Sequence, residues 1–442
     1  MRLRPFAFLV GFLLSFSLCL AAEPAAVPIK VTIGTDRTDA LYACGQQAKF
    51  RVTVTDEGKP VTEGMVTAVI TRDGGEVLGK KTLDLATPEG ATFVVGLDQP
   101  GFARVEATFS RDKKDYRGLA GAGFDPEKIV ATTVNPADFD TFWTTARNQL
   151  AELPLDVQLT KLDAKSGPNL DSYAISFANV DNTRIYGFLS VPKGRQGPFP
   201  AYVSVPGAGP GPFGSEATWA AQGCLSLVMG VHAYDVGSLG KDGINAAYKE
   251  LNANGTYSHI GKPDREKFYF YRAILGVDRA IEWLAARPDW DGVHLVVDGS
   301  SQGGAFALIM AGLNQRVTAA AANVPALCEH AAYLAKRQPG WPNLTNHLEG
   351  QDRDAVLAMS AYFDAVNFAR RIKCPVIVSA GFIDRTCPPS TVYAAYNQIQ
   401  TPKRMFPDPL AGHQWAVGEF RTFQPKWLAG RLGIAPACEP GD

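Results

Sequence analysis

The stretch from residue 293 to residue 313 constrains the fold of this chain more than any other. It reads VHLVVDGSSQGGAFALIMAGL, with Ser301 at the centre of a Gly-x-Ser-x-Gly pentapeptide. A β-branched apolar run comes first, a Gly-Ser turn follows, and later apolar residues recur at helical spacing. Between a strand and a helix, this pentapeptide is typical of a nucleophilic serine on a strained turn. A glycine-rich turn without chemistry, as in nucleotide-binding folds, is the alternative.

The residues around Ser301 suit such a turn. Gly299 and Gly303 stand two positions before and two positions after the serine. Because they lack a Cβ atom, the strand and the helix can cross closely there. The helix that follows points its first amides toward whatever binds at the serine. We therefore expect the backbone amide of Gln302 to donate a hydrogen bond to a developing oxyanion.

The whole chain has an ordinary globular composition. Its 442 residues are 46% hydrophobic and 20% charged, and the formal net charge is -1. This length is enough for two domains. The charge balance gives no sign of nucleic acid or of an anionic membrane as a partner.

The N-terminus, residues 1–22, is typical of a secretory signal peptide. Arg2 and Arg4 precede an apolar run that ends at Ala21-Ala22, which offers a cleavage site. A lipid anchor on Cys19 is the alternative. No later segment has the roughly twenty apolar residues that would span a bilayer. We expect a periplasmic or secreted protein with no membrane partner after signal removal.

Six of the seven cysteines follow the signal peptide. Their even number permits disulfides in an exported protein, although most of them sit near apolar runs and resemble small buried residues. The Cys-x-x-Cys spacing of metal sites is absent. No metal or organic cofactor is expected.

Residues 28–112 alternate between apolar and polar side chains. Residues 50–55, for example, read FRVTVT, and turns such as Asp73-Gly74-Gly75 separate the runs. Several short strands at this spacing predict a small immunoglobulin-like β-sandwich domain. We expect it to serve for packing or spacing, since no exposed aromatic cluster in it indicates sugar binding.

An α/β domain is expected over residues 135–435, after a connector rich in small residues over residues 113–134. Asn135 or Asp138 is placed to cap its first helix. Further along, apolar β-type runs alternate with helical patterns, of which residues 268–286 are the clearest. This alternation predicts an α/β fold with a mostly parallel central sheet covered on both faces. The expected strands are residues 172–177, 185–191, 201–205, 225–229, 294–297, 316–321 and 374–380.

A nucleophilic serine needs a general base and a group that orients this base. In α/β-hydrolases the acid and then the histidine follow the serine, each on a loop after a strand. His413 fits this order, whereas His330 and His347 have no strand before them and are expected to be solvated. Asp384 follows an apolar run and is placed to orient the imidazole. Asp408 is the alternative acid, but its Pro-flanked position favours capping of a turn.

A second oxyanion donor is expected on the loop after an early strand. Pro206-Gly207-Ala208-Gly209-Pro210 follows the apolar run of residues 201–205. Its glycines would let backbone amides approach a carbonyl oxygen closely. The amide of Ala208 is our candidate, and a plain Pro/Gly turn is the alternative.

Seven stretches between Asp138 and Gly412, one of them around Ser301, carry a resemblance to a known family. They are DFDTFW from residue 138, IYGFLSVP from 185, FYFYR from 268, GSSQGG from 299, NVPALC from 323, YFDAVNFARRIKCP from 362 and IDRTCPPST from 383. On these motifs, and on their order, the chain resembles the acetyl xylan esterases and cephalosporin C deacetylases of carbohydrate esterase family seven.

The resemblance implies an α/β-hydrolase that removes acetyl groups from short xylo-oligosaccharides and related small esters. It implies Ser301, Asp384 and His413 as nucleophile, acid and base, which agrees with their order in the chain. It also implies the amides of Gln302 and Ala208 as oxyanion donors.

The chain departs from the family pattern at several positions. His232-Ala233-Tyr234 stands where the family has Arg-Gly-Gln, and Pro206-Gly207-Ala208 stands where the family has His-Gly-Tyr. Gln414 follows His413 in place of the family's Glu. The expected N-terminal β-sandwich is an addition to the family pattern. The family typically forms hexamers, and the sequence does not decide whether this chain does.

We therefore expect a secreted serine carboxylesterase that deacetylates a small-molecule or oligosaccharide ester. A hydrolase for another acyl ester or for a peptide is the first alternative. A non-catalytic carbohydrate-binding protein on a hydrolase scaffold is the second, and the complete set of serine, acid and histidine argues against it.

Overall fold

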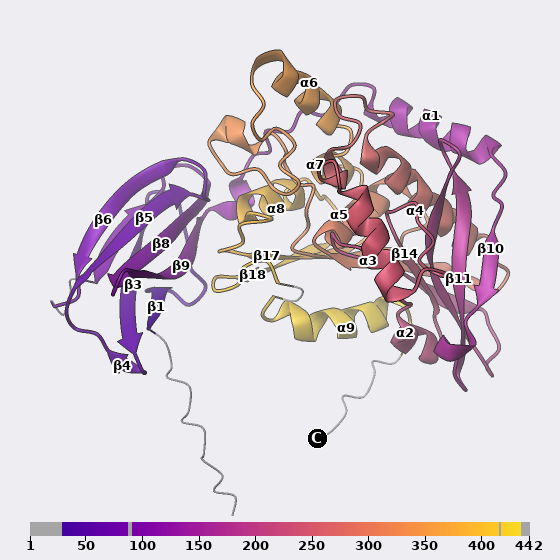
Figure 1. The fold of residues 1–442 in the computed structure, drawn as a ribbon, viewed down its shortest axis with the longest axis horizontal. Helices are drawn as coiled ribbons and strands as arrows, with labels where there is room; N and C mark the ends of the chain where they lie inside the picture. Colours follow the sequence, from indigo (N-terminus) through magenta and orange to yellow (C-terminus); the bar gives the residue numbers. More distant parts are fainter. Residues whose placement is uncertain (1–28, 87–90, 415–416, 435–442) are drawn as a thin grey trace, which may run out of the picture.

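The computed structural model describes residues 29–86, 91–414 and 417–434 (Figure 1). The signal peptide expected over residues 1–22 lies outside the described residues. Within the described ranges, the chain forms two N-terminal β-sheets and a larger part in which helices cover a long central sheet. No helix in these ranges is both long enough and apolar enough to cross a membrane.

The central sheet has nine strands in the order β10-β11-β12-β14-β13-β15-β16-β17-β18. The pairings from β10 through β12 to β14 are antiparallel. Those from β14 through β13 to β18 are parallel. The strands are β10 (Gln158–Lys161), β11 (Leu170–Asn179), β12 (Thr183–Pro192), β13 (Phe199–Val205), β14 (Leu225–Met229), β15 (Trp290–Ser300), β16 (Ala319–Asn323), β17 (Val376–Gly381) and β18 (Lys403–Asp408).

Helices cover both faces of this sheet (Figure 1). Phe420 and Leu428 of α9 pack on one face, while α4, α5 and α7 pack on the other. The α-helices are α1 (Phe139–Glu152), α2 (Ala217–Ala221), α3 (Gly240–Leu251), α4 (Tyr269–Ala285), α5 (Gln302–Leu313), α6 (Gly350–Ser360), α7 (Ala365–Ala369), α8 (Pro389–Tyr396) and α9 (Phe420–Arg431). Within the described ranges, the 3-10 helix η1 (Pro126–Lys128) precedes α1, and η2 (Asp163–Lys165), η3 (Tyr257–His259) and η4 (Ala332–Ala335) lie between α-helices.

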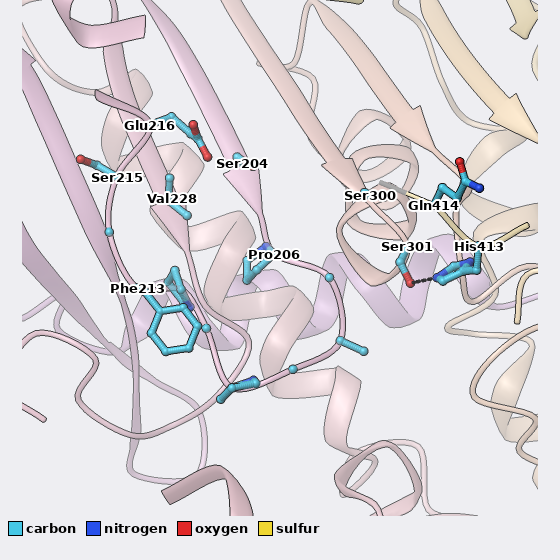
Figure 2. Close-up of a pocket in the computed structure, with 17 residues that line it drawn as sticks. Ser204, Pro206, Phe213, Ser215, Glu216, Val228, Ser300, Ser301, His413 and Gln414 are labelled. Atoms are coloured by element: carbon cyan, nitrogen blue, oxygen red, sulfur yellow. Dashed lines mark hydrogen bonds between the residues drawn. The ribbon is translucent and has the colours of Figure 1, made fainter. Parts of the chain in front are cut away.

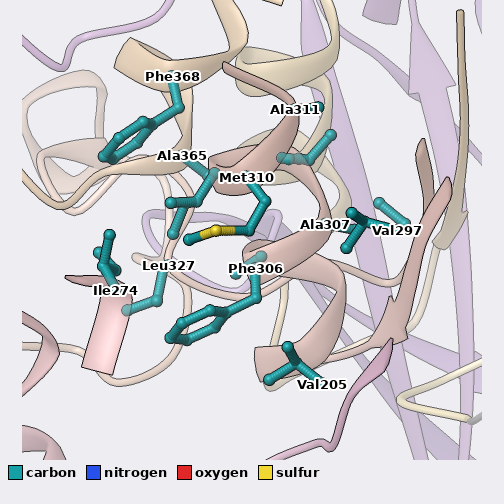
Figure 3. Close-up of a cluster of buried hydrophobic side chains, with 14 of the residues drawn as sticks. Val205, Ile274, Val297, Phe306, Ala307, Met310, Ala311, Leu327, Ala365 and Phe368 are labelled. Carbon is teal, nitrogen blue, oxygen red and sulfur yellow. The ribbon is translucent and has the colours of Figure 1, made fainter. Parts of the chain in front are cut away.

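The helix α5 is buried on almost every side, which explains why it is apolar all round rather than amphipathic. Phe306 and Met310 are fully buried, and Figure 3 shows them among side chains of α4, α7 and the loop after β16. Full burial of one such side chain stabilises the fold by about 1.5–3 kcal/mol. At Gly312 a Cβ atom would lie 2.2 Å from the carbonyl oxygen of Phe368, so only glycine permits this approach of α7. Ser301, the residue before α5, is thereby attached to a tightly packed helix.

The N-terminal sheets, β1 to β9, share one buried apolar core. Phe50, Val52 and Val54 all point into it, as the alternating pattern predicted. The immunoglobulin-like topology stays a prediction. One sheet holds β1 (Lys30–Thr35), β3 (Gln47–Asp56), β4 (Lys59–Pro60) and β7 (Thr92–Gly96); the other holds β2 (Leu41–Tyr42), β5 (Met65–Arg72), β6 (Val77–Asp84), β8 (Gly101–Arg111) and β9 (Lys114–Phe124).

The connector expected over residues 113–134 differs from the structure. Its first half is the strand β9, which pairs with β8 along its whole length. The small residues that suggested a linker are buried, because β9 packs against other backbone segments. The extended segment between η1 and α1, residues 129–135, is what remains of the connector.

The first helix of the α/β part begins where expected, but its cap differs. Asp138 occupies the position before α1, and its side chain makes no capping hydrogen bond. Its carboxylate instead accepts hydrogen bonds from Tyr362 and Arg265. These partners come from distant parts of the chain, so the local sequence could not indicate them.

Candidate active site

Ser301 lies at the sharp turn between β15 and α5. Its φ of 57° and ψ of -118° are strained for a residue with a side chain. Its amide donates to the carbonyl oxygen of Asn323 at 2.9 Å, and its own carbonyl oxygen accepts from the amide of Ala326 at 2.9 Å. One bond to the end of β16 and one to the loop that follows it therefore hold the serine in this conformation.

The glycines on either side of Ser301 are required by close backbone contacts. A Cβ atom on Gly303 would lie 2.0 Å from the carbonyl oxygen of Val205 at the end of β13. One on Gly299 would lie 2.4 Å from the carbonyl carbon of Gly303. The pentapeptide is thus a packing requirement as well as a chemical one.

The structure brings Ser301, His413 and Asp384 together. His413 Nε2 lies 2.8 Å from Ser301 Oγ, and His413 Nδ1 lies 2.8 Å from Asp384 Oδ2 (Figure 2 shows the first contact). A carboxylate only accepts hydrogen bonds, so Nδ1 carries the proton and the lone pair of Nε2 faces the serine hydroxyl. This geometry can draw a proton from Ser301 Oγ.

Asp384 follows β17 and is fully buried. Its Oδ1 accepts hydrogen bonds from the amides of Thr386 at 2.7 Å and Cys387 at 2.9 Å. Its Oδ2 faces His413. Both carboxylate oxygens are therefore satisfied, and the side chain has one defined orientation.

A metal ion is the other chemistry that this corner could support. In the part of the chain that the structure describes, Asp384, Cys387 and His413 are the one group of three residues with ligand atoms within 4.8 Å of one another. Burial raises the pKa of the Cys387 thiol well above its usual value, so this sulfur disfavours the thiolate that binds metals. Hydrogen bonding already satisfies the carboxylate, so the arrangement suits proton transfer better than cation binding.

The other candidates for base and acid lie elsewhere. His347 is exposed, as expected, and Asp408 caps its own turn by accepting from the amide of Leu410 at 3.0 Å. The expectation of a solvated His330 was wrong, since this residue is only 1% exposed. The segment around His330, which follows β16, is buried, and the amide of His330 donates to Asp364 Oδ2 at 2.8 Å.

The two candidate oxyanion donors lie on opposite sides of Ser301 along the chain. Gln302 begins α5, and its side-chain amide reaches the carbonyl oxygen of Pro206 at 3.4 Å. At Gly207 a Cβ atom would lie 3.8 Å from Ser301 Cβ, so the loop of residues 206–210 passes close to the serine. Ala208 follows on this loop and lines the same cavity as Ser301.

Two residues that the sequence analysis did not place in the site hold this loop. His232 Nε2 lies 2.9 Å from the carbonyl oxygen of Gly209, and Tyr234 donates to the carbonyl oxygen of Pro210 at 2.6 Å. His232 Nδ1 lies 2.6 Å from the hydroxyl of Tyr269. Because a carbonyl only accepts, Nε2 is the protonated nitrogen and Tyr269 donates to Nδ1.

The electrostatic setting of His232 favours the neutral ring. Burial is the main cause that lowers the pKa of His232 to about 4, against an ordinary value of 6.5. The rings of Tyr234, Tyr248, Tyr257 and Tyr269 surround it. The departure from the family's Arg-Gly-Gln at residues 232–234 was the one sequence signal that pointed here.

A cavity of 650 Å³ opens beside Ser301 and His413 (Figure 2). The loop of residues 206–214 forms most of its wall, and Phe213 on this loop is 44% exposed. The cavity is far larger than the two carbon atoms of an acetyl group. It leaves room for a bulkier group on the other side of an ester bond.

Comparison with known proteins identifies the family. The sequence pattern of the acetyl xylan esterase family matches residues 127–429. The chain belongs to the acetyl xylan esterase family. This esterase is 33% identical over 409 residues to acetyl esterase Axe7A of Xylanibacter ruminicola. The alignment covers 89% of this chain and 88% of that protein.

Solved structures agree with this assignment. An acetyl xylan esterase from Paenibacillus sp. R4 is 26% identical, with a TM-score of 0.60, and covers 70% of this chain and 98% of its own. Acetyl xylan esterase 1 from Thermoanaerobacterium sp. JW/SL YS485 shares the fold at 22% identity, with a TM-score of 0.59 and coverage of 69% and 97%. The expected α/β-hydrolase-like fold is confirmed. The protein is a carboxylic ester hydrolase of acetyl esters, and its substrate is a small-molecule or oligosaccharide ester.

Proposed function

We propose that this esterase works through an acetyl-enzyme on Ser301, with His413 as general base and Asp384 as the group that orients it. The hydrogen-bonded line from Ser301 through His413 to Asp384, with both contacts at 2.8 Å, is the observation that carries the proposal. His413 Nε2 takes the hydroxyl proton as Ser301 Oγ attacks the acetyl carbonyl carbon. The imidazolium formed is stabilised by the buried carboxylate of Asp384.

The negative charge that develops on the carbonyl oxygen needs donors in place before the reaction. The amides of Gln302 and Ala208 are our candidates, since one begins α5 and the other lies on the loop beside Ser301. The hydrogen bonds of His232 and Tyr234 to Gly209 and Pro210 support the second donor by holding its loop.

The tetrahedral intermediate then collapses. The bond between the acetyl carbon and the alcohol oxygen breaks, and the imidazolium of His413 gives its proton to that oxygen. A water molecule enters, loses a proton to His413 Nε2 and attacks acetyl-Ser301. Acetate leaves, and Ser301 regains its proton.

We further propose that the substrate is an acetylated xylo-oligosaccharide or a related small sugar ester, so that the alcohol released is the sugar with a free hydroxyl group. The size of the cavity beside Ser301 and the exposed ring of Phe213 support a sugar-sized leaving group. Aromatic faces offer a flat apolar surface with a polar edge. The names of the relatives support the same substrate class.

Export is also part of the proposal. Residues 1–22 have the charge and apolar pattern of a signal peptide. Fractionation of a bacterial host, followed by N-terminal sequencing of the purified protein, should give an exported chain that begins at Glu23. An unprocessed chain confined to the cytoplasm would contradict this part.

The experiment that tests the function is a substrate panel. Acetate release from acetylated xylo-oligosaccharides is compared with hydrolysis of nitrophenyl acetate, butyrate and octanoate, and of a dipeptide anilide. We expect kcat/KM to be highest for acetyl esters and to fall as the acyl chain lengthens. Higher kcat/KM on the longer acyl esters or on the anilide would favour the alternative hydrolase, and glycan binding without turnover would favour the binding protein.

A further inference from the structure

One face of β8 in the N-terminal sheets meets the loop that carries Asp384. Alternate residues from 103 to 109 on this strand lie in the core of the N-terminal sheets. Successive side chains of a strand point to opposite faces. Phe102, Arg104 and Glu106 therefore share the other face, which is turned toward the α/β part.

The apolar contact on this face lies two residues before Asp384. Phe102 packs edge-on against Phe382, with ring centroids 4.9 Å apart, and also touches Tyr393. On the neighbouring strand β9, a Cβ atom on Gly121 would lie 2.5 Å from the carbonyl oxygen of Phe382. The backbone of β9 thus lies directly against the start of the loop.

The polar contact reaches Asp384 itself. Arg104 is only 9% exposed, and its Nη1 lies 3.5 Å from the carbonyl oxygen of Asp384. Its Nη2 donates to Gln338 Oε1 at 3.2 Å, and Gln338 donates in turn to the carbonyl oxygen of Arg385 at 2.8 Å. At Gly74 a Cβ atom would lie 1.8 Å from Arg104 Nη2, so this glycine leaves room for the guanidinium.

Two further contacts extend the support along the loop. Glu106 forms an ion pair with Arg385. The buried side chain of Asp73, in the turn after β5, accepts from the amide of Ser390 at 2.9 Å at the start of α8. From Phe382 to Tyr393, the N-terminal sheets therefore hold the loop before, at and after Asp384.

These contacts come from strands that precede the part of the chain matched by the family pattern. The family pattern begins at residue 127, after β9. The Paenibacillus esterase structure matches 98% of its own chain to 70% of this one. The support of the loop by β5, β8 and β9 therefore comes from outside the part of the chain that the family pattern matches.

We propose that the N-terminal sheets position the Asp384 loop, with Arg104 as the positioning residue. The proposal rests on the serine mechanism proposed above, in which Asp384 orients His413. A displacement of about 1 Å in such a group can slow catalysis by about a hundredfold. Arg104 touches no reacting atom. It therefore affects kcat only through the position of the loop that carries Asp384.

The test is Arg104→Met in the full-length chain, assayed on nitrophenyl acetate well below its melting temperature. We expect kcat to fall by about ten- to a hundredfold with KM within about twofold of wild type. Arg104→Lys, which restores a cationic donor, should recover part of the loss. Arg111→Met removes an arginine from the far end of the same strand, where Arg111 pairs with Asp56, and should leave kcat at the wild-type value.

A lower melting temperature with unchanged kcat and KM in Arg104→Met would show a structural role only and overturn the proposal. Asp384→Asn separates the two proposals. Full activity in Asp384→Asn would overturn the serine mechanism, whereas its inactivity beside a fully active Arg104→Met would overturn the positioning role alone.

A charge exchange covers the case in which Arg104→Met does not fold. Glu106→Arg and Arg385→Glu each place like charges side by side at the edge of the loop. We expect each single variant to lower kcat and the double variant to restore it. Wild-type kcat in both single variants would also overturn the proposal.

Discussion

His413 Nε2 lies 2.8 Å from Ser301 Oγ, on a serine whose backbone has a positive φ of 57°. The strained turn lifts the hydroxyl away from β15 and toward the loop that follows β18. The base and the nucleophile thus come from elements more than a hundred residues apart in the chain. Rigid packing of α5 behind the serine keeps this distance short.

The first prediction concerns the nucleophile. Ser301→Ala removes the attacking oxygen, so kcat on nitrophenyl acetate should fall by at least about a thousandfold. The matched control is Ser300→Ala. The hydroxyl of Ser300 accepts a hydrogen bond from Asn323 at 2.8 Å, and its removal should lower kcat by less than about tenfold. A fluorophosphonate probe should label the wild type and the control but not Ser301→Ala. Labelling of Ser301→Ala would contradict the assignment.

The second prediction concerns the acid. In Asp384→Asn the two amide donors at Oδ1, from Thr386 and Cys387, keep the amide oxygen on their side. The NH2 group then faces His413 Nδ1 and forces the wrong tautomer, so kcat should fall by about a thousand- to ten-thousandfold. Asp408→Asn is the matched control, because Asp408 caps a neighbouring turn. An equal loss in both variants would contradict the role of Asp384.

The third prediction concerns the turn itself. A Cβ atom on Gly303 would overlap the carbonyl oxygen of Val205 at 2.0 Å. Since both atoms belong to backbone, Gly303→Ala should lower the free energy of unfolding by about 3 kcal/mol or more. Gly430→Ala in α9 is the control, because nothing lies within 4 Å of its Cβ position. In that variant the free energy of unfolding, measured with urea, should rise by up to about 1 kcal/mol.

The sequence alone indicated the central part of the fold because local patterns and tertiary structure agree there. β15, its turn and α5 carry apolar runs, glycines and helical spacing in the order that the structure shows. Chain order then singled out Asp384 and His413, and the structure brings both to Ser301.

Other features could not be predicted because the same local sequence pattern can have two different structural causes. Small residues suggested a linker before η1, yet Gly118 and Gly121 are small because β9 packs against the backbone of Val31 and Phe382. His330 stands in a polar segment and is nevertheless buried, since a distant carboxylate, Asp364, binds its amide. Long-range contacts of this kind leave no local signal.

The last prediction uses the low pKa of His232, about 4 against 6.5 in the unfolded chain. Between these two pH values the unfolded state binds the proton and the folded state does not, so stability is lost as the pH falls from 6.5 toward 4. The size of the pKa difference corresponds to about 3 kcal/mol. His232→Gln keeps a donor toward the carbonyl oxygen of Gly209 but cannot titrate. Urea unfolding at pH 7, 6, 5 and 4 should therefore show the stability of the wild type falling relative to that of the variant by about this amount. A constant difference between the two proteins across the series would contradict a neutral, buried His232 behind the oxyanion loop.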